Sequence, residues 1–192
     1  FLPDGTEKIL KEKDIVRIEE HLRLTKEFLA TKNLADAIPA SVAITIRSAI
    51  PPAIGIASSA AVFATLATAY GQIANGKSQM ANLSLRDISI IARLGSGSAA
   101  RSIFGGFAAL INTPNCKLQI VNCKSIDSAY GIQIAPPEHW LLHDFIIVPT
   151  MEEKKIGSTE GHHMAYTSPL FKKRIKAIST CRQQTCIDAI LK

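Results

Sequence analysis

Residues 51–61 read Pro-Pro-Ala-Ile-Gly-Ile-Ala-Ser-Ser-Ala-Ala, and a run of helix formers follows them. The two prolines favour an extended approach that cannot continue a helix, and Gly55 allows the backbone to turn or to approach a ligand closely. A buried helix is therefore predicted to open at about Ser58 and to end near residues 71–76. The alternating segment 41–47 before the loop predicts a strand.

The start of this helix is suited to an anion. Its first turn contains two hydroxyls, Ser58 and Ser59, and no charged side chain. A helix N-terminus has roughly half a positive charge and up to four unpaired N–H groups, which favours phosphate. The alternative is a serine cap of a core helix, worth about 1 kcal/mol. The local pattern does not separate the two interpretations.

A second segment, residues 94–107, reads Leu-Gly-Ser-Gly-Ser-Ala-Ala-Arg-Ser-Ile-Phe-Gly-Gly-Phe. Ser96 and Ser98 flank a glycine, and Arg101 lies about one helical turn further on, so all three can face one ligand. A guanidinium binds a carboxylate or phosphate with two parallel hydrogen bonds. The alternative is a Gly/Ser-rich loop in which Arg101 pairs with a nearby acid.

Further elements follow from periodicity and turn residues. An amphipathic helix is predicted over 14–32, with Asp14 as its cap and Arg17 and Arg23 on its polar flanks. Ser84 and Asp87 form a predicted capping box, from which a helix runs to Gly95. Strands are predicted over 107–111, 128–134 and 143–148, and a last helix over 168–182.

Composition excludes several classes of protein. The chain has 192 residues, of which 47% are hydrophobic and 20% charged, as in a globular domain. It has no apolar run of the roughly 20 residues that cross a bilayer, so we expect no membrane partner. The net charge of +6 is scattered, and the basic cluster 172–174 is too short for a nucleic-acid surface. We therefore expect no nucleic-acid partner.

Cysteines and histidines show no metal-binding pattern. Cys116, Cys123, Cys181 and Cys186 include no Cys-x-x-Cys pair, which favours reduced cytosolic thiols. The pairs His139 with His143 and His162 with His163 lack a carboxylate at metal-ligand spacing. The chain begins at Phe1 without a leader peptide, which suggests a fragment.

Three segments together carry a family resemblance. The stretch from Pro51 to Ala60 resembles the phosphate-binding motif of the GHMP kinase superfamily. Residues 92–107 are similar to a signature of its mevalonate diphosphate decarboxylase branch. Residues 155–161 and 167–171 are similar to that branch's Ser-Thr-x-Gly-Met and Thr-Ser-x-Leu-Phe segments. The resemblance covers nearly the whole chain, with His162 in place of Met and Ala100 where relatives often have Cys or Ser.

The resemblance implies a GHMP-kinase fold of the α/β (α+β) class with its active site in a cleft between two domains. Residues 1–135 would form an N-terminal, ATP-binding domain of the ribosomal protein S5 domain 2-like type that lacks its first strands. Residues 136–192 would begin a ferredoxin-like C-terminal domain. The boundary near Ala135-Pro136-Pro137 also follows from the two prolines between predicted strands.

The resemblance further implies ATP-dependent decarboxylation of mevalonate 5-diphosphate to isopentenyl diphosphate by a cytoplasmic homodimer, with ATP and Mg²⁺. Arg101 would bind the substrate carboxylate. The ATP phosphates would contact Gly55, Ile56, Ala57, Ser58, Ser59 and Ala60. The other substrate contacts would be Arg17, Ser96, Gly97, Ser98, Ala99, Ala100, Ser158 and Thr159.

Two alternatives stay open at this point. One is a kinase or decarboxylase of the same superfamily that acts on mevalonate or phosphomevalonate, and the other is a non-catalytic nucleotide-binding paralogue. The resemblance also implies that the N-terminal substrate contacts precede Phe1 and that the general-base aspartate lies beyond Lys192. We therefore expect the 192-residue chain alone to be inactive.

Overall fold

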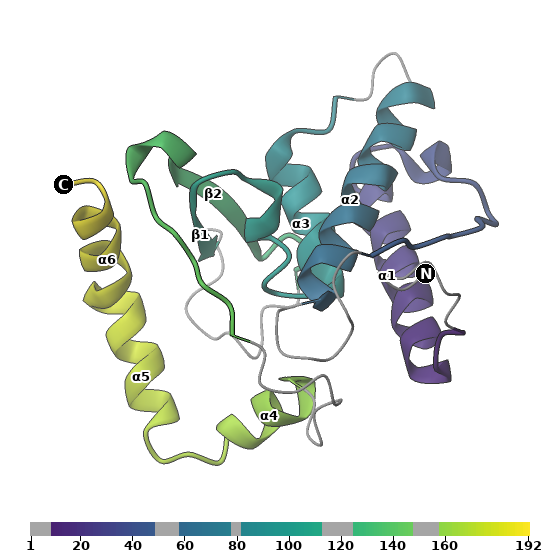
Figure 1. The fold of residues 1–192 in the computed structure, drawn as a ribbon. Coiled ribbons are helices and arrows are strands. Elements are labelled where there is room, and N and C mark those ends of the chain that lie inside the picture. The colour runs from purple at the N-terminus through teal and green to yellow at the C-terminus, as the bar shows by residue number, and fades with distance from the viewer. Residues whose placement is uncertain (1–8, 49–57, 78–81, 113–124, 148–157) are drawn as a thin grey trace.

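The computed structural model describes residues 9–48, 58–77, 82–112, 125–147 and 158–192. Three layers are visible in Figure 1: a layer of three helices, a small sheet, and a C-terminal helical segment on the far side of the sheet. The α-helices are α1 (Glu12–Ala30), α2 (Ser58–Lys77), α3 (Leu85–Gly95), α4 (Ser158–Ala165), α5 (Phe171–Ala177) and α6 (Gln183–Ile190). The short 3-10 helices are η1 (Ala35–Ala37), η2 (Arg101–Ile103) and η3 (Pro137–His139).

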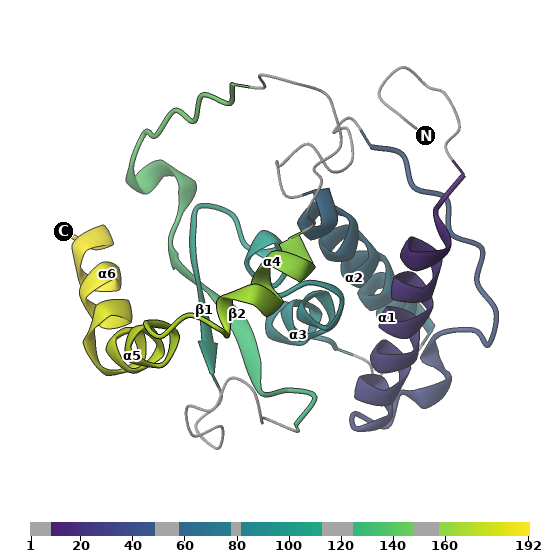
Figure 2. The ribbon, with the colours of Figure 1, turned by 90° about the horizontal axis from the view of Figure 1, so that it is seen from below.

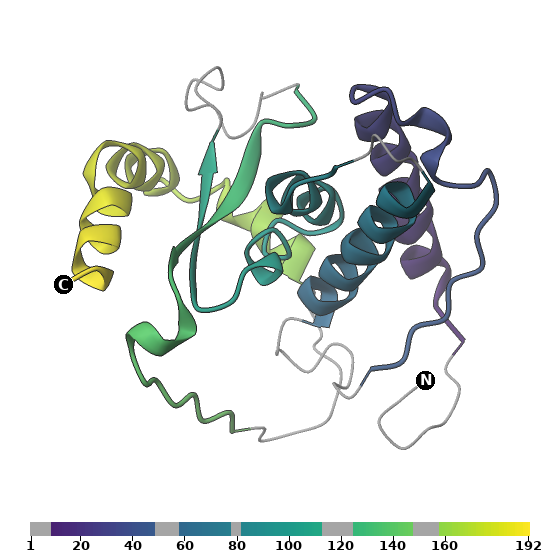
Figure 3. The same cartoon turned by 90° about the horizontal axis from the view of Figure 1, so that it is seen from above.

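The core lies between α1, α2 and α3, which pack side by side (Figure 3). Phe28 and Leu29 of α1 and Ile91 of α3 are among its largest fully buried side chains. The helix predicted at Ser58 is confirmed as α2, which runs on to Lys77. It buries one face only: Phe63 and Tyr70 are buried, whereas Thr65 and Thr68 on the other face are exposed.

The predicted capping box at the start of α3 is confirmed. The Ser84 hydroxyl accepts a hydrogen bond from the Asp87 amide at 3.2 Å, and the Asp87 carboxylate accepts one from the Ser84 amide at 3.0 Å. Lys32 adds an ion pair to Asp87 at 2.9 Å. Burial would raise the pKa of Asp87, but hydrogen bonds from Ser84 and Lys32 together bring it below its usual value.

The sheet formed by the described residues is an antiparallel pair, β1 (Phe107–Asn112) and β2 (Ala129–Ala135). Both strands were predicted within one residue at each end. Gly106 precedes β1 with a φ of +68°, and an added Cβ there would lie 2.4 Å from the carbonyl oxygen of Ala135, so glycine is required. One face of the sheet meets α3, and α5 and α6 lie on the other side (Figure 2).

Two predictions for the first 48 residues are wrong. Asp14 is not a cap, because α1 begins at Glu12 after Lys11, and Asp14 already donates its amide to the Lys11 carbonyl. The predicted strand 41–47 has no regular secondary structure and pairs with neither strand of the described sheet. The alternation in 41–47 therefore did not indicate a paired strand.

The C-terminal predictions also need correction. The predicted strand 143–148 is not formed over its described residues 143–147, where Phe145 and Ile147 are each 87% exposed. The helix predicted over 168–182 begins at Phe171 and continues through a π-helical turn (Ile178–Arg182) into α6. Gln183 of α6 donates to the Leu110 carbonyl at 2.7 Å, which ties this segment to β1.

The observed mixture of helices and a small antiparallel sheet agrees with the α+β class. Its assignment to S5-like and ferredoxin-like domains, and the boundary at Ala135, stay predictions. Within the described ranges, no helix combines the length and apolarity needed to cross a membrane.

Candidate functional site

Arg101 lies on a tight turn between α3 and β1. The Arg101 amide donates to the Ser98 carbonyl at 3.2 Å, and the next amide, of Ser102, donates to the Ala99 carbonyl at 3.0 Å. Ala99 and Ala100 are completely buried, whereas Arg101 is exposed. Within the part of the chain that the structure describes, the Arg101 guanidinium has no hydrogen bond or ion pair. The alternative in which Arg101 pairs with a nearby acid therefore has no support among the described residues.

Two hydroxyls stand before this turn. Ser96 Oγ and Ser98 Oγ lie 3.2 Å apart, and both residues are half-buried while Gly97 between them is exposed. Among the described residues, an added Cβ at Gly97 would meet nothing within 4 Å, so they leave the loop open on this side. The segment 96–101 thus offers two hydroxyls and one guanidinium on a short, hydrogen-bonded piece of backbone.

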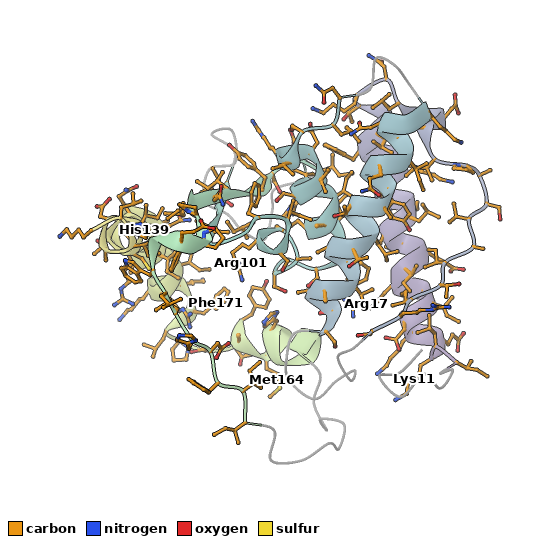
Figure 4. The ribbon with its side chains drawn as sticks, turned by 45° about the horizontal axis from the view of Figure 1, so that its top comes forward. Lys11, Arg17, Arg101, His139, Met164 and Phe171 are labelled. Atoms are coloured by element: carbon orange, nitrogen blue, oxygen red, sulfur yellow. The ribbon has the colours of Figure 1, made fainter. Side chains whose placement is uncertain are left out.

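Arg17 reaches the same end of α3 from α1. It donates through Nη2 to the Gly95 carbonyl at 3.2 Å, and its guanidinium carbon lies 5.1 Å from the centre of the Phe63 ring. A cation at a helix C-terminus satisfies an unpaired carbonyl and opposes the helix dipole. This contact places Arg17 at the end of α3, directly before Ser96, so the structure brings two predicted site elements together. Arg17 and Arg101 are labelled in Figure 4.

Phe63 packs against Arg17, and His21 packs against Phe63 within the core. The Phe63 ring packs edge-on against His21 with centroids 4.9 Å apart, and Phe63 is 3% exposed. His21 donates through Nε2 to the Ile91 carbonyl at 2.9 Å. Burial lowers the pKa of His21, and the hydrogen bond to Ile91 raises it in part, with a net lowering. A neutral His21 therefore fits this core at neutral pH.

The predicted phosphate loop is described only at its helical end. Ser58 and Ser59 begin α2, are half-buried, and precede the buried Ala60. The first turn of α2 has no acidic side chain, which agrees with an anion in front of it. Gly55, Ile56 and Ala57 lie outside the described residues.

Ser158 and Thr159 begin α4. Figure 1 shows α4 below the three-helix layer. The side chains of Ser158 and Thr159 are outside the described part, so their direction stays a prediction.

A separate recess of about 300 Å³ runs along α2. Its described lining residues are Ala64, Thr65, Thr68, Ala69, Gln72 and Ser102. None of these six was predicted as a site residue. The recess therefore does not coincide with the predicted anion site.

Cys181, Cys186 and His139 lie outside the predicted anion site. Cys181 and Cys186 are exposed free thiols. His139 stacks on Trp140, with ring centroids 5.8 Å apart, and hydrogen-bonds the Ile190 carbonyl, which is a packing role. Among the described residues, no group of three or more His, Cys, Asp or Glu side chains could hold a metal ion.

Comparison with known proteins decides the family. The family model described as the diphosphomevalonate decarboxylase-like N-terminal domain matches residues 4–117. The chain belongs to this family. The match contains Arg17, the predicted phosphate loop and the whole segment 96–101.

Curated relatives agree with the diphosphomevalonate decarboxylase-like assignment. The diphosphomevalonate decarboxylase of Ganoderma lucidum is 38% identical over 152 residues, which cover 78% of this chain and 35% of the relative. The Candida albicans enzyme of that name is 37% identical over 143 residues, 73% of this chain and 36% of the relative. The Homo sapiens enzyme is 33% identical over 153 residues, 77% of this chain and 34% of the relative. The chain thus spans about a third of the length of these relatives.

Sequence reasoning missed three residues that organise the described part of the candidate site: Phe63, Ser89 and Gly131. Ser89 bridges the backbone of Ala100 and Gly131, and Phe63 lies under Arg17. A glycine within a strand and a serine within the apolar run 88–91 were visible signals of close packing. Neither signal says which residue is the partner.

Proposed function

We propose that this chain supplies the nucleotide-binding and carboxylate-binding residues of a diphosphomevalonate decarboxylase. The reaction converts mevalonate 5-diphosphate and ATP into isopentenyl diphosphate, ADP, phosphate and carbon dioxide. The observation that carries the proposal is the match of residues 4–117 to the family, together with the names of the curated relatives. Arg101 lies within that match, is exposed and has no hydrogen bond or ion pair to the described residues, which supports the proposal.

Arg101 is the residue to which we assign the substrate carboxylate. Transfer of the ATP γ-phosphoryl group to the tertiary hydroxyl creates a phosphate leaving group. When that phosphate leaves, the electrons of the bond to the carboxylate form the new double bond, and carbon dioxide departs. A fixed guanidinium fork can hold the carboxylate so that this bond is aligned with the leaving group.

The other contacts follow the same proposal. Gly55 to Ala60 would bind the ATP phosphates at the start of α2, where the helix dipole favours negative charge. Arg17 and Ser96 to Ala100 would contact the substrate, with Ser158 and Thr159 at its diphosphate end. Bound Mg²⁺ neutralises phosphate charge in such reactions, and the hydroxyls of Ser58 and Ser59 would lie near it. Cytoplasmic location and a homodimer stay predictions from the sequence.

The test uses the full-length gene product and carboxyl-labelled mevalonate 5-diphosphate. We expect ATP-dependent release of labelled carbon dioxide matched by ADP. Arg101→Ala should lower turnover by about 10²-fold, as the loss of one oriented donor does in other sites. Arg23→Ala is the matched control, because Arg23 is an exposed arginine of α1 that pairs only with its helical neighbours Glu20 and Glu27 among the described residues.

The outcomes separate the alternatives. ADP formation without release of carbon dioxide would refute the decarboxylase proposal and favour a kinase that phosphorylates the 3-hydroxyl group. ATP binding by calorimetry without any turnover would favour the non-catalytic nucleotide-binding paralogue, and no binding of ATP would favour a scaffold that keeps the loops only for stability. Equal rates for Arg101→Ala and Arg23→Ala would remove Arg101 from the proposed carboxylate site.

A further inference from the structure

Ser89 lies in the middle of α3 and is completely buried. A serine inside a helix commonly bonds back to a carbonyl of its own helix. Ser89 instead bonds to two distant backbone groups: its Oγ lies 2.9 Å from the Ala100 carbonyl oxygen and 2.7 Å from the Gly131 amide nitrogen. An amide can only donate and a carbonyl can only accept, so the hydroxyl accepts from Gly131 and donates to Ala100.

The Ala100 carbonyl is enclosed from two sides. An added Cβ at Gly131 would lie 2.5 Å from the Ala100 oxygen and 3.0 Å from Ser89 Oγ. The backbone of β2 therefore approaches Ala100 as closely as only glycine permits. Gly131 is itself paired with Leu110 of β1, so this wall is part of the sheet.

These contacts restrain the peptide unit that joins Ala100 to Arg101. Its carbonyl accepts from Ser89 at 2.9 Å, and its N–H donates to the Ser98 carbonyl at 3.2 Å. Both ends of one rigid peptide plane are thus held, since the plane itself does not flex. The Cα of Arg101 is attached to this plane, and the guanidinium extends from there into solvent.

We infer that Ser89 is a positioning residue for Arg101, because its buried hydroxyl fixes the peptide plane from which Arg101 reaches its ligand. The inference rests on the proposed function for its effect on turnover, but its effect on the backbone is independent of that function. A tilt of the plane by 10–20° would move the end of a long side chain by about 1 Å, a displacement that can cost on the order of 10²-fold in rate.

The first measurement is amide hydrogen exchange in the full-length gene product. Ser89→Ala should speed exchange of the amides of residues 101–104 by about tenfold or more. Ser84→Ala is the matched control: it also removes a serine hydroxyl at α3, but one that caps the helix and does not bond Ala100. Equal exchange of residues 101–104 in the two variants would overturn the inference.

The second measurement is a double-mutant cycle on turnover. Ser89→Ala should lower turnover about tenfold or more in the native background and should have no further effect once Arg101→Ala is present. Equal losses in both backgrounds would show a general structural role and overturn the inference. If Arg101→Ala alone leaves turnover unchanged, the carboxylate assignment fails, and hydrogen exchange still decides whether Ser89 holds the turn.

A second variant at position 89 keeps the inference testable if Ser89→Ala does not fold. If Ser89→Ala does not fold, Ser89→Cys replaces it, because the somewhat larger thiol leaves no cavity but is a weak hydrogen-bond donor. Faster exchange of residues 101–104 is again the expected result. Exchange at the native rate in Ser89→Cys would overturn the inference.

Discussion

Gly95→Ala is the most direct test of how the end of α3 is packed. A Cβ added at Gly95 would lie 2.1 Å from Cδ1, 2.3 Å from Cγ and 2.7 Å from Cε1 of Phe63. Contacts under 3.0 Å essentially never occur at a Cβ, so the ring must move. It has little room, because it packs edge-on against the buried His21 and lies under Arg17.

The size of the effect follows from two opposing terms. Adding a methyl group to a packed core typically costs about 1–3 kcal/mol. The higher helix propensity of alanine offsets up to about 1 kcal/mol. We therefore expect Gly95→Ala to lower the free energy of unfolding by about 1–2 kcal/mol.

Urea unfolding of four variants measures this. Gly76→Ala in α2 is the control, because its Cβ would meet no described atom within 4 Å, so the variant should be as stable as the native protein or more stable. Phe63→Leu removes the ring atoms that meet Cβ, so adding Gly95→Ala to it should cost about 1 kcal/mol less than in the native background. Strictly additive losses, or equal stability of Gly95→Ala and Gly76→Ala, would refute the reasoning.

Three further outcomes are expected. Burial lowers the pKa of His21 below its value in the unfolded chain, so the unfolded state binds more protons, and the free energy of unfolding should fall as pH drops below about 6.5, by up to about 1.4 kcal/mol per pH unit. Urea unfolding between about pH 5 and pH 8 should show a steeper dependence of this free energy on pH for the native protein than for His21→Gln, and the same pH dependence in both would contradict the argument. Ser84→Ala removes the acceptor for the Asp87 amide and should cost about 1 kcal/mol by the same assay, whereas no change would mean that the cap contributes nothing. Gly106→Ala should destabilise more than Ser84→Ala, because it combines a φ of +68° with a Cβ 2.4 Å from the Ala135 oxygen; a smaller loss in calorimetry would show that the turn adapts.

Local signals were sufficient where an element is defined by its own residues. The capping box at Ser84, the start of α2 at Ser58 and the two strands each follow from neighbouring residues, and each is confirmed. The strands predicted over 41–47 and 143–148 failed for a physical reason. Alternation shows that a segment can present one apolar face, but a strand also requires a partner, and pairing is not encoded within the segment.

The candidate site shows the same division. The Gly/Ser loop and Arg101 were recognisable from a continuous stretch of sequence. Phe63, Ser89 and Gly131 were not, because their roles come from contacts across the fold. Ser89 and Gly131 are 42 residues apart, and no periodicity or motif joins them. Packing in three dimensions was needed to show that a serine in an apolar helix face bonds to the turn before Arg101.

These contacts make α3 the element that holds the described part of the site. Its first turn is fixed to the end of α1 by the ion pair of Asp87 with Lys32. Its middle holds the turn before Arg101 through Ser89, and its last carbonyl, at Gly95, accepts from Arg17. Both arginines are therefore held by contacts to one helix of 11 residues. A shift of α3 would move them together and preserve the spacing between the two proposed anion-binding groups. A change within α3 that breaks one of these contacts, such as Ser89→Ala, should alter that spacing. A change that only lowers the stability of α3 and keeps the contacts should leave the spacing as it is.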